Sequence, residues 1–167
     1  VARDARRVLL IANPASQSGR GADAAAEAEV LLREALPGAQ VEVRPTAGPR
    51  HGRELAAGAA GLDVVVALGG DGIIHEVVNG LMTLSADARP ALGVIPVGSG
   101  NDYAATLSME RNVAQAVAQL VDARPTLVDV GCVNGVYFAE TLSFGLDAAI
   151  ALDTVERRKR TGRTGTL

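Results

Sequence analysis

The sequence is poor in aromatic residues, and this shortage excludes one large class of binding protein. Aromatic side chains make up 2% of the 167 residues, and tryptophan is absent. Proteins that bind single-stranded nucleic acid stack bases on such side chains. The formal net charge of −3 makes binding to a phosphodiester backbone still less favoured. We therefore expect no nucleic-acid partner.

Cysteine, lysine and long apolar runs are also scarce. Cys132 is the single cysteine, which excludes an intrachain disulfide and a cysteine-based zinc site. Lys159 is the single lysine, and it does not follow the glycine-rich loop that a P-loop requires. No apolar run approaches the ~18 residues of a membrane span, and the N-terminus lacks the apolar region of a signal peptide. We expect a cytoplasmic protein that meets a membrane only peripherally.

Short apolar runs alternate with segments of helical periodicity, which predicts an α/β fold. Apolar strands are expected at Val8–Ala12, Asp63–Leu68 and Ala91–Val97, and a more exposed strand at Gln40–Arg44. Unbroken apolar strands separated by helices indicate a doubly wound parallel sheet, Rossmann-like, with both faces covered. The remaining expected elements are helices at Ala22–Leu36, Arg50–Ala60, Ile74–Met82, Asn101–Leu107 and Asn112–Val121 and a strand at Pro125–Val130.

The pattern changes after Gly131. An Asn-Gly pair at Asn134 is typical of a tight hairpin turn, and no helical segment follows it directly. We predict an antiparallel strand over Asn134–Leu146. The expected organisation is a nucleotide-binding α/β domain over 1–131 and the start of a truncated β-rich domain over 132–167.

Basic residues gather near the C-terminus. Residues 156–167 hold five of the 16 basic side chains and one acid. Such a cluster is consistent with the solvated end of a helix, or with a surface that faces an anionic membrane or a phosphorylated ligand.

Four polar or glycine-rich loops follow the predicted parallel strands: Asn13–Gly21, Pro45–Arg50, Gly69–Gly72 and Pro96–Asp102. In an open parallel sheet ligands bind beyond the carboxyl ends of the strands, so these loops are expected to share one edge. Bare backbone N–H groups at the start of a helix bind phosphate. Asp71 would repel that phosphate unless a positive charge lies between them, and Mg²⁺ is the expected mediator.

Several of these residues also have a purely structural interpretation. Asp71 is suited to cap the following helix, and Ser99 with Asp102 has the spacing of a capping box. His75 is expected on a polar helix face, where a solvated or hydrogen-bonded histidine is common. Asn13 before a proline is a usual turn residue.

At these positions the sequence resembles the diacylglycerol kinase catalytic-domain superfamily, which includes sphingosine kinases and bacterial lipid kinases. "NPASQSGRG" resembles its first loop with one inserted residue. "GGDGIIHEVVNGL" and "LGVIPVGSGNDYA" resemble its two signature motifs, and "SFGLDA" resembles the segment that opens its second domain.

The resemblance implies a kinase that transfers the γ-phosphoryl group of ATP-Mg²⁺ to a lipid hydroxyl, most simply diacylglycerol or a related lipid. Asp71 would then be the catalytic and metal-binding acid, with Glu76 and Asn79 as supports of its loop. Ile73 stands where many members carry a hydroxyl. The implied nucleotide-binding residues are Asn13, Pro14, Ser18, Gly19, Arg20, Thr46, Gly69, Gly70, Asp71, Gly72, Ile73, His75, Glu76, Gly98, Ser99 and Asn101.

Two other functions remain open from the sequence. An NAD kinase also uses a GGDG loop on a similar fold, and a non-catalytic nucleotide-binding module would need the same loops. ATP and a lipid at a membrane surface are the expected partners, and a homodimer is left open.

Overall fold

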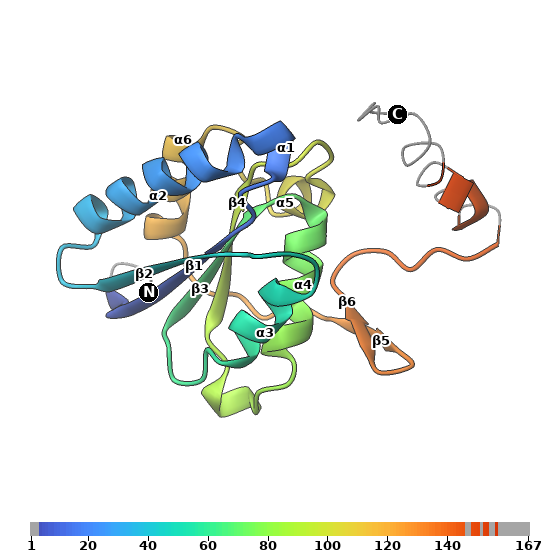
Figure 1. The fold of residues 1–167 in the computed structure, drawn as a ribbon. Helices are drawn as coiled ribbons and strands as arrows, with labels where there is room; N and C mark the ends of the chain where they lie inside the picture. The colour runs from blue at the N-terminus through green and yellow to red at the C-terminus, as the bar shows by residue number, and fades with distance from the viewer. Residues whose placement is uncertain (1–3, 146–147, 151, 154–155, 157–167) are drawn as a thin grey trace.

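A parallel sheet of four strands forms the centre of the protein (Figure 1). The computed structural model describes residues 4–145, 148–150, 152–153 and 156. The strand order is β2-β1-β3-β4, and the register pairs Leu10 of β1 with Val43 of β2 and with Val66 of β3. The strands are β1 (Arg7–Ala12), β2 (Gln40–Pro45), β3 (Val64–Gly69) and β4 (Ala91–Pro96).

Helices cover both faces of this sheet, which confirms the doubly wound α/β prediction. One apolar cluster joins α2 and α6 to strand residues such as Leu10, and the other joins α3, α4 and α5 to residues such as Ile11. Figure 1 shows α2 and α6 above the sheet and α3 and α4 on its other side. The helices are α1 (Ser16–Gly19), α2 (Gly21–Ala35), α3 (His51–Ala57), α4 (Asp71–Leu81), η2 (Ala86–Ala88), α5 (Asp102–Thr106) and α6 (Val113–Asp122).

The helix α4 crosses α3 at close range. The predicted apolar stripe of α4 is buried, including Ile74, Val77 and Leu81. At Gly80 the two backbones meet, because a Cβ placed there would lie 3.0 Å from the backbone N of Ala57 and still closer to the carbonyl oxygen of Arg53. A residue with a side chain at position 80 would push α4 away from α3. The close contact therefore fixes the position of α4 and of the loop that precedes it.

The structure corrects two strand predictions. Residues Pro125–Val130 form no strand, because no described strand pairs with them, and Leu127 is fully exposed. The strand predicted over Asn134–Leu146 is limited to β6 (Val136–Phe138), which pairs with β5 (Gly131–Val133). The Asn-Gly turn is confirmed, since Asn134 and Gly135 have φ of 49° and 76°. Leu146 lies outside the described residues.

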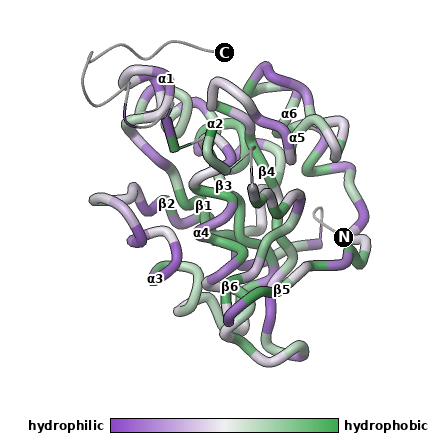
Figure 2. Tube along the Cα trace, turned by 90° about the vertical axis from the view of Figure 1, so that its right-hand side faces the viewer, coloured by the Kyte–Doolittle hydropathy of each residue, from purple (hydrophilic) through white to green (hydrophobic). Residues whose placement is uncertain are grey.

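Apolar residues concentrate at the centre of the fold. In Figure 2 the central strands are coloured hydrophobic, whereas hydrophilic segments lie toward the periphery. Of the helices in the described residues, none combines the length and the apolar character needed to cross a bilayer. Residues 157–167, which contain the predicted basic cluster, lie outside the described part of the chain.

Candidate functional site

Three connections meet at the carboxyl end of the sheet and enclose a cavity of about 320 Å³, here called the loop cavity. They follow β1, β3 and β4, and the sheet order places β2 and β3 on opposite sides of β1. Ligands of open α/β sheets bind at such a reversal of strand order. The lining residues are Asn13, Ser16, Gln17, Gly70, Asp71, Gly72, Ile73, Gly98, Ser99 and Gly100.

The loops after β3 and β4 touch through their glycines. A Cβ at Gly70 would lie 3.1 Å from the Cα of Gly98, so a larger residue would push the two loops apart. Asn101 holds the second loop in shape, because its amide accepts from the backbone N of Gly98 and donates to the carbonyl of Gly98, both at 2.8 Å. The result is a wall of bare backbone at the start of α4, which can bind an anion through N–H groups.

Asp71 connects these two loops. Its carboxylate accepts from the backbone N of Asn101 at 2.9 Å and from that of Tyr103 at 3.3 Å. The helix-cap interpretation is wrong, because α4 has Gly70 at its N-cap and no side-chain cap. The capping box is also wrong, since α5 begins at Asp102 with no side-chain cap. The carboxylate is instead oriented by donors from a different loop and stays half-exposed at the cavity.

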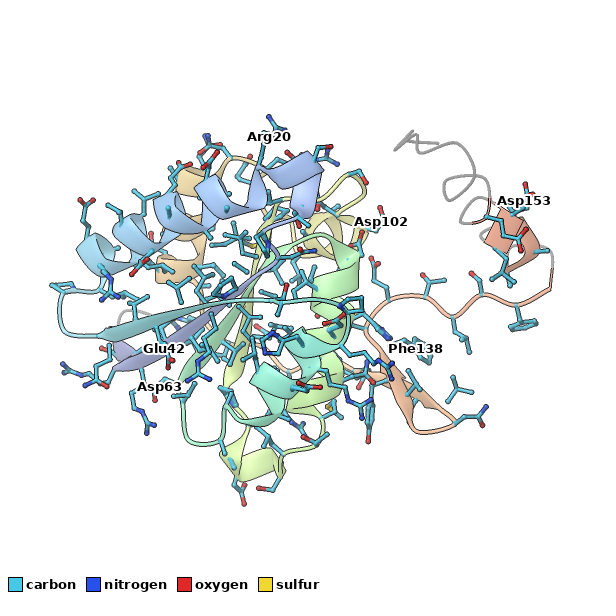
Figure 3. The ribbon with its side chains drawn as sticks, in the orientation of Figure 1. Arg20, Glu42, Asp63, Asp102, Phe138 and Asp153 are labelled. Atoms are coloured by element: carbon cyan, nitrogen blue, oxygen red, sulfur yellow. The ribbon has the colours of Figure 1, made fainter. Side chains whose placement is uncertain are left out.

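The loop after β1 contacts the loop after β4. Gln17 donates from Nε2 to the carbonyl of Gly98 at 3.1 Å, and Arg20 donates to the side-chain oxygen of Gln17. Gln17 and Ser18 both have left-handed backbone conformations, with φ of 47° and 60°. Strained backbone of this kind is found at ligand-binding sites. Arg20 itself is exposed, and in Figure 3 its side chain extends away from the sheet.

The loop after β2 stands apart from the loop cavity. The backbone N of Thr46 donates to the carbonyl of Ala12 at 2.8 Å, which continues the pairing of β2 with β1. Glu76 accepts from the backbone N of Arg50 at 2.8 Å and of Gly52 at 3.0 Å. Glu76 therefore supports the start of α3 from the neighbouring α4.

The structure brings part of the predicted set together. The loop cavity is lined by the predicted residues Asn13, Gly70, Asp71, Gly72, Ile73, Gly98 and Ser99. The predicted residues outside its lining are Pro14, Ser18, Gly19, Arg20, Thr46, Gly69, His75, Glu76 and Asn101.

Sequence reasoning missed Ser16, Gln17 and Gly100. The first loop has one inserted residue relative to the family motif, and the motif's serine was therefore assigned to Ser18 and not to Ser16. Gly100 lies inside the predicted loop Pro96–Asp102, so its position in the sequence could have identified it as a residue of the site. Nothing in the sequence marks Gln17, because its role depends on a backbone conformation that a glutamine rarely adopts.

A second cavity, here called the hairpin cavity, lies on the other side of Asp71. It has a volume of about 230 Å³ and opens between α4, α5 and the segment that follows the β5–β6 hairpin. Figure 3 labels Asp102 of α5 and Phe138 of β6, which belong to different walls. The lining residues are Asp71, Ile74, His75, Asp102, Tyr103, Phe138, Ala139, Glu140 and Thr141.

Asn79 attaches the hairpin to α4. Its amide accepts from the backbone N of Tyr137 and donates to the carbonyl of Tyr137, both at 2.9 Å. It also donates to the carbonyl of His75 at 2.9 Å. Asn79 thus fixes the hairpin that carries one wall of the second cavity, whereas the resemblance implied that it would support the glycine loop.

The phenol of Tyr103, which lines the hairpin cavity, has a raised pKa. Burial raises the pKa of its phenol, and the nearby negative charge of Glu140 raises it further. The phenol therefore stays protonated and can donate a hydrogen bond across the neutral range.

Within the described residues no group of three or more acidic, histidine or cysteine side chains is arranged to hold a metal ion. Asp71 alone offers a carboxylate to the loop cavity. This donor set fits Mg²⁺, which binds one or two carboxylates and takes its other oxygens from substrate phosphates and water. It does not fit a metal held by protein side chains alone.

Glycine loops at the carboxyl ends of parallel strands, with one acid fixed between them, are the arrangement through which many α/β domains bind phosphates. Residues 7–133 match the family described as diacylglycerol kinase catalytic domain, and the chain belongs to this family.

Named relatives agree with this assignment. The chain is 35% identical over 157 residues to the diacylglycerol kinase of Bacillus subtilis, covering 92% of this chain and 50% of that protein. It is 41% identical over 113 residues to "Probable lipid kinase YegS-like" of Chromohalobacter salexigens, covering 68% of this chain and 36% of that protein. A crystal structure of a diacylglycerol kinase from Bacillus anthracis superposes with a TM-score of 0.73 at 30% identity, covering 81% of this chain and 46% of that chain. The chain thus spans half or less of the length of these relatives.

Proposed function

We propose that the protein is an ATP-dependent lipid kinase that transfers the γ-phosphoryl group to the hydroxyl of diacylglycerol or a related lipid. The observation that carries this proposal is the position of Asp71, which lines the loop cavity and the hairpin cavity together. A phosphoryl transfer needs a donor and an acceptor on opposite sides of the reacting group. The names of the relatives, diacylglycerol kinase and lipid kinase, support the same activity.

The loop cavity would hold the phosphates of ATP. Its walls supply backbone N–H groups from the loops after β3 and β4, and side-chain oxygens from Ser16 and Ser99. Asp71 would hold Mg²⁺ together with the phosphates, and the ion, when bound, neutralises the negative charge that Asp71 and the phosphates share. Arg20 and Thr46 lie outside the lining, so each would contribute only if it moved toward the cavity.

The hairpin cavity would hold the acceptor hydroxyl. The proton of the hydroxyl would pass to Asp71, or to an acid elsewhere in the full-length protein, while the hydroxyl oxygen forms the new bond to the γ-phosphorus. The bond from that phosphorus to the oxygen it shares with the β-phosphate would break, and ADP would leave with the electron pair of that bond. Asp71 is suited to this task because two backbone donors fix its carboxylate. We further propose that residues 132–167 belong to the acceptor-binding part of the protein, which would meet its substrate peripherally at a membrane surface.

Transfer of radiolabel tests this proposal. The full-length protein is incubated with γ-labelled ATP and Mg²⁺, with either diacylglycerol in neutral detergent micelles or NAD as acceptor. We expect label in the lipid and none in NAD. Label in NAD alone would assign the protein to the NAD kinases, and ATP binding without label in either would indicate a non-catalytic nucleotide-binding module.

A further inference from the structure

The hairpin cavity has a strongly acidic lining. Asp71, Asp102 and Glu140 line it from α4, from α5 and from the segment after β6. No lysine or arginine lines it, and His75 is the one basic side chain of the lining. Neither Asp102 nor Glu140 forms an ion pair with the part of the chain that the structure describes. Glu140 is held in place by the hydroxyl of Thr106, which donates to its carboxylate at 3.1 Å.

The loop cavity differs sharply in charge. Apart from the apolar Ile73, its lining consists of backbone, amide and hydroxyl groups, with Asp71 as its single acid. An anionic group that binds in the loop cavity therefore meets one carboxylate, whereas the same group in the hairpin cavity would meet three. The two sides of Asp71 are thus suited to ligand groups of different charge.

A second observation shows that the hairpin cavity has a polar group free for a ligand. Tyr103 is 8% exposed, and its hydroxyl has no hydrogen-bond partner among the described residues, whereas its backbone N donates to Asp71. All enclosed side-chain nitrogen and oxygen atoms of the described residues have partners, so this hydroxyl is open to the cavity that the residue lines. A ligand oxygen can therefore accept a hydrogen bond from this hydroxyl in place of solvent water.

We propose that the hairpin cavity selects an acceptor whose headgroup has no negative charge, with Glu140 and Asp102 repelling anionic headgroups and the Tyr103 hydroxyl donating to an oxygen of the accepted lipid. This inference rests on the lipid kinase function proposed above. A diacylglycerol presents ester oxygens to Tyr103 and no charge to the acids. A lipid with a phosphate headgroup would place a charge beside carboxylates in a partly enclosed space, where repulsion is weakly screened.

The test compares two acceptors that differ in headgroup charge. The full-length protein phosphorylates dioleoylglycerol or dioleoyl-phosphatidylglycerol at equal mole fraction in neutral detergent micelles, with labelled ATP. We expect kcat/KM for the uncharged lipid to exceed that for the anionic lipid by at least about 10-fold. Glu140→Gln should improve the relative use of the anionic lipid by about 3- to 10-fold.

Two further variants and one control complete the experiment. Asp102→Asn should shift the ratio of the two kcat/KM values in the same direction as Glu140→Gln. It replaces Glu140→Gln in the test if the Glu140→Gln protein does not fold. Tyr103→Phe keeps the ring and should raise KM for dioleoylglycerol while KM for ATP stays unchanged. Glu34→Gln makes the same charge change on the exposed side of α2, outside both cavities, and should leave the ratio unaltered.

The outcomes separate the two proposals. If the wild type phosphorylates phosphatidylglycerol as well as dioleoylglycerol or better, the proposed charge selection is wrong but the lipid kinase function stands. The same conclusion follows if neither Glu140→Gln nor Asp102→Asn changes the ratio of kcat/KM for the two lipids. An unchanged KM for dioleoylglycerol in Tyr103→Phe overturns the role of the phenol. Failure to label either lipid overturns the lipid kinase function and this inference with it.

Discussion

At the scale of single residues, Asp71 shows how backbone donors can prepare one acid for a reaction. Replacing it with asparagine keeps the size but turns one acceptor into an NH₂ group that faces the backbone N–H donors of Asn101 and Tyr103. In the full-length protein we expect Asp71→Asn to reduce lipid phosphorylation by at least about 100-fold, while the protein still folds, with a somewhat lower melting temperature because one backbone donor loses its acceptor. Asp87→Asn, on the exposed η2, is the matched control. Near-normal turnover of Asp71→Asn would refute its assigned role.

Asp63 provides a residue-scale prediction about stability. The backbone N–H groups of Arg6 and Arg7 donate to its carboxylate at 2.7 and 2.9 Å, and these bonds lower its pKa. A lowered pKa in the folded state adds stability above the unfolded pKa of ~3.9, and this stability is lost as the pH falls through the folded value. Because the side chain is exposed and solvent screens the interaction, Asp63→Ala should lower the free energy of unfolding at pH 7 by less than about 1 kcal/mol.

Urea unfolding at pH 7 and at pH 3 measures this effect. The difference between wild type and Asp63→Ala should shrink at the lower pH, because the wild-type carboxyl group then begins to protonate. Asp129→Ala, at an exposed position between α6 and β5, should show neither effect. An equal difference at both pH values would show that the carboxylate charge does not matter.

The site residues differ in how far the sequence reveals them. Gly70, Asp71 and Gly98 could be predicted, because glycines at the junction of a strand and a helix are typical of a loop that binds phosphate through its backbone. Gln17 could not, since its bond to Gly98 depends on a left-handed backbone at a residue type that seldom adopts one. Glu76 was expected at the nucleotide, yet it supports α3, because only the tertiary structure shows which loop its helix faces.

At the scale of elements, the crossing of α3 and α4 depends on Gly80. A methyl group there would meet Ala56 and the carbonyl of Arg53. We expect Gly80→Ala to lower the free energy of unfolding by about 1–3 kcal/mol, since the two helices must separate. Gly72→Ala in the same helix is the control, because no atom lies within 4 Å of its added Cβ. Urea denaturation compares them, and equal stability of the two variants would contradict the close crossing.

Asn79 attaches the β5–β6 hairpin to α4, and this attachment can be tested. Its two bonds to Tyr137 are the side-chain hydrogen bonds that join the hairpin to the helix in the described structure. We expect Asn79→Ala to speed hydrogen exchange at the Tyr137 amide, because that amide loses its acceptor. The amide of Leu10 in the central sheet should be unaffected. Unchanged protection at Tyr137 would show that the hairpin is held by other contacts.

Elements with strong periodicity were predictable, and those that need a distant partner were not. The stripe of α4 and the apolar runs of β1 and β3 match their predictions closely, because burial on one or two faces is encoded locally. Pro125–Val130 has the composition of a strand but no partner among the described residues. A strand requires hydrogen bonds from a neighbour, and a single segment of sequence does not reveal whether one is present.

At the scale of the whole molecule, two cavities with linings of different charge share one residue, Asp71. The sheet places three glycine-rich or polar connections at one edge, and Asn79 fixes the hairpin on the far side of Asp71. The loop cavity would receive the phosphates and the hairpin cavity the lipid. Membership of the diacylglycerol kinase catalytic domain family is consistent with this division.

A crystal structure of the full-length protein with Mg²⁺ and a non-hydrolysable ATP analogue tests the central claim most directly. We predict that the phosphates lie in the loop cavity, within hydrogen-bonding distance of backbone N–H groups between Gly70 and Gly72 and near Ser99, with Mg²⁺ between them and Asp71. Phosphates bound at any other surface, or a metal ion remote from Asp71, would contradict the account.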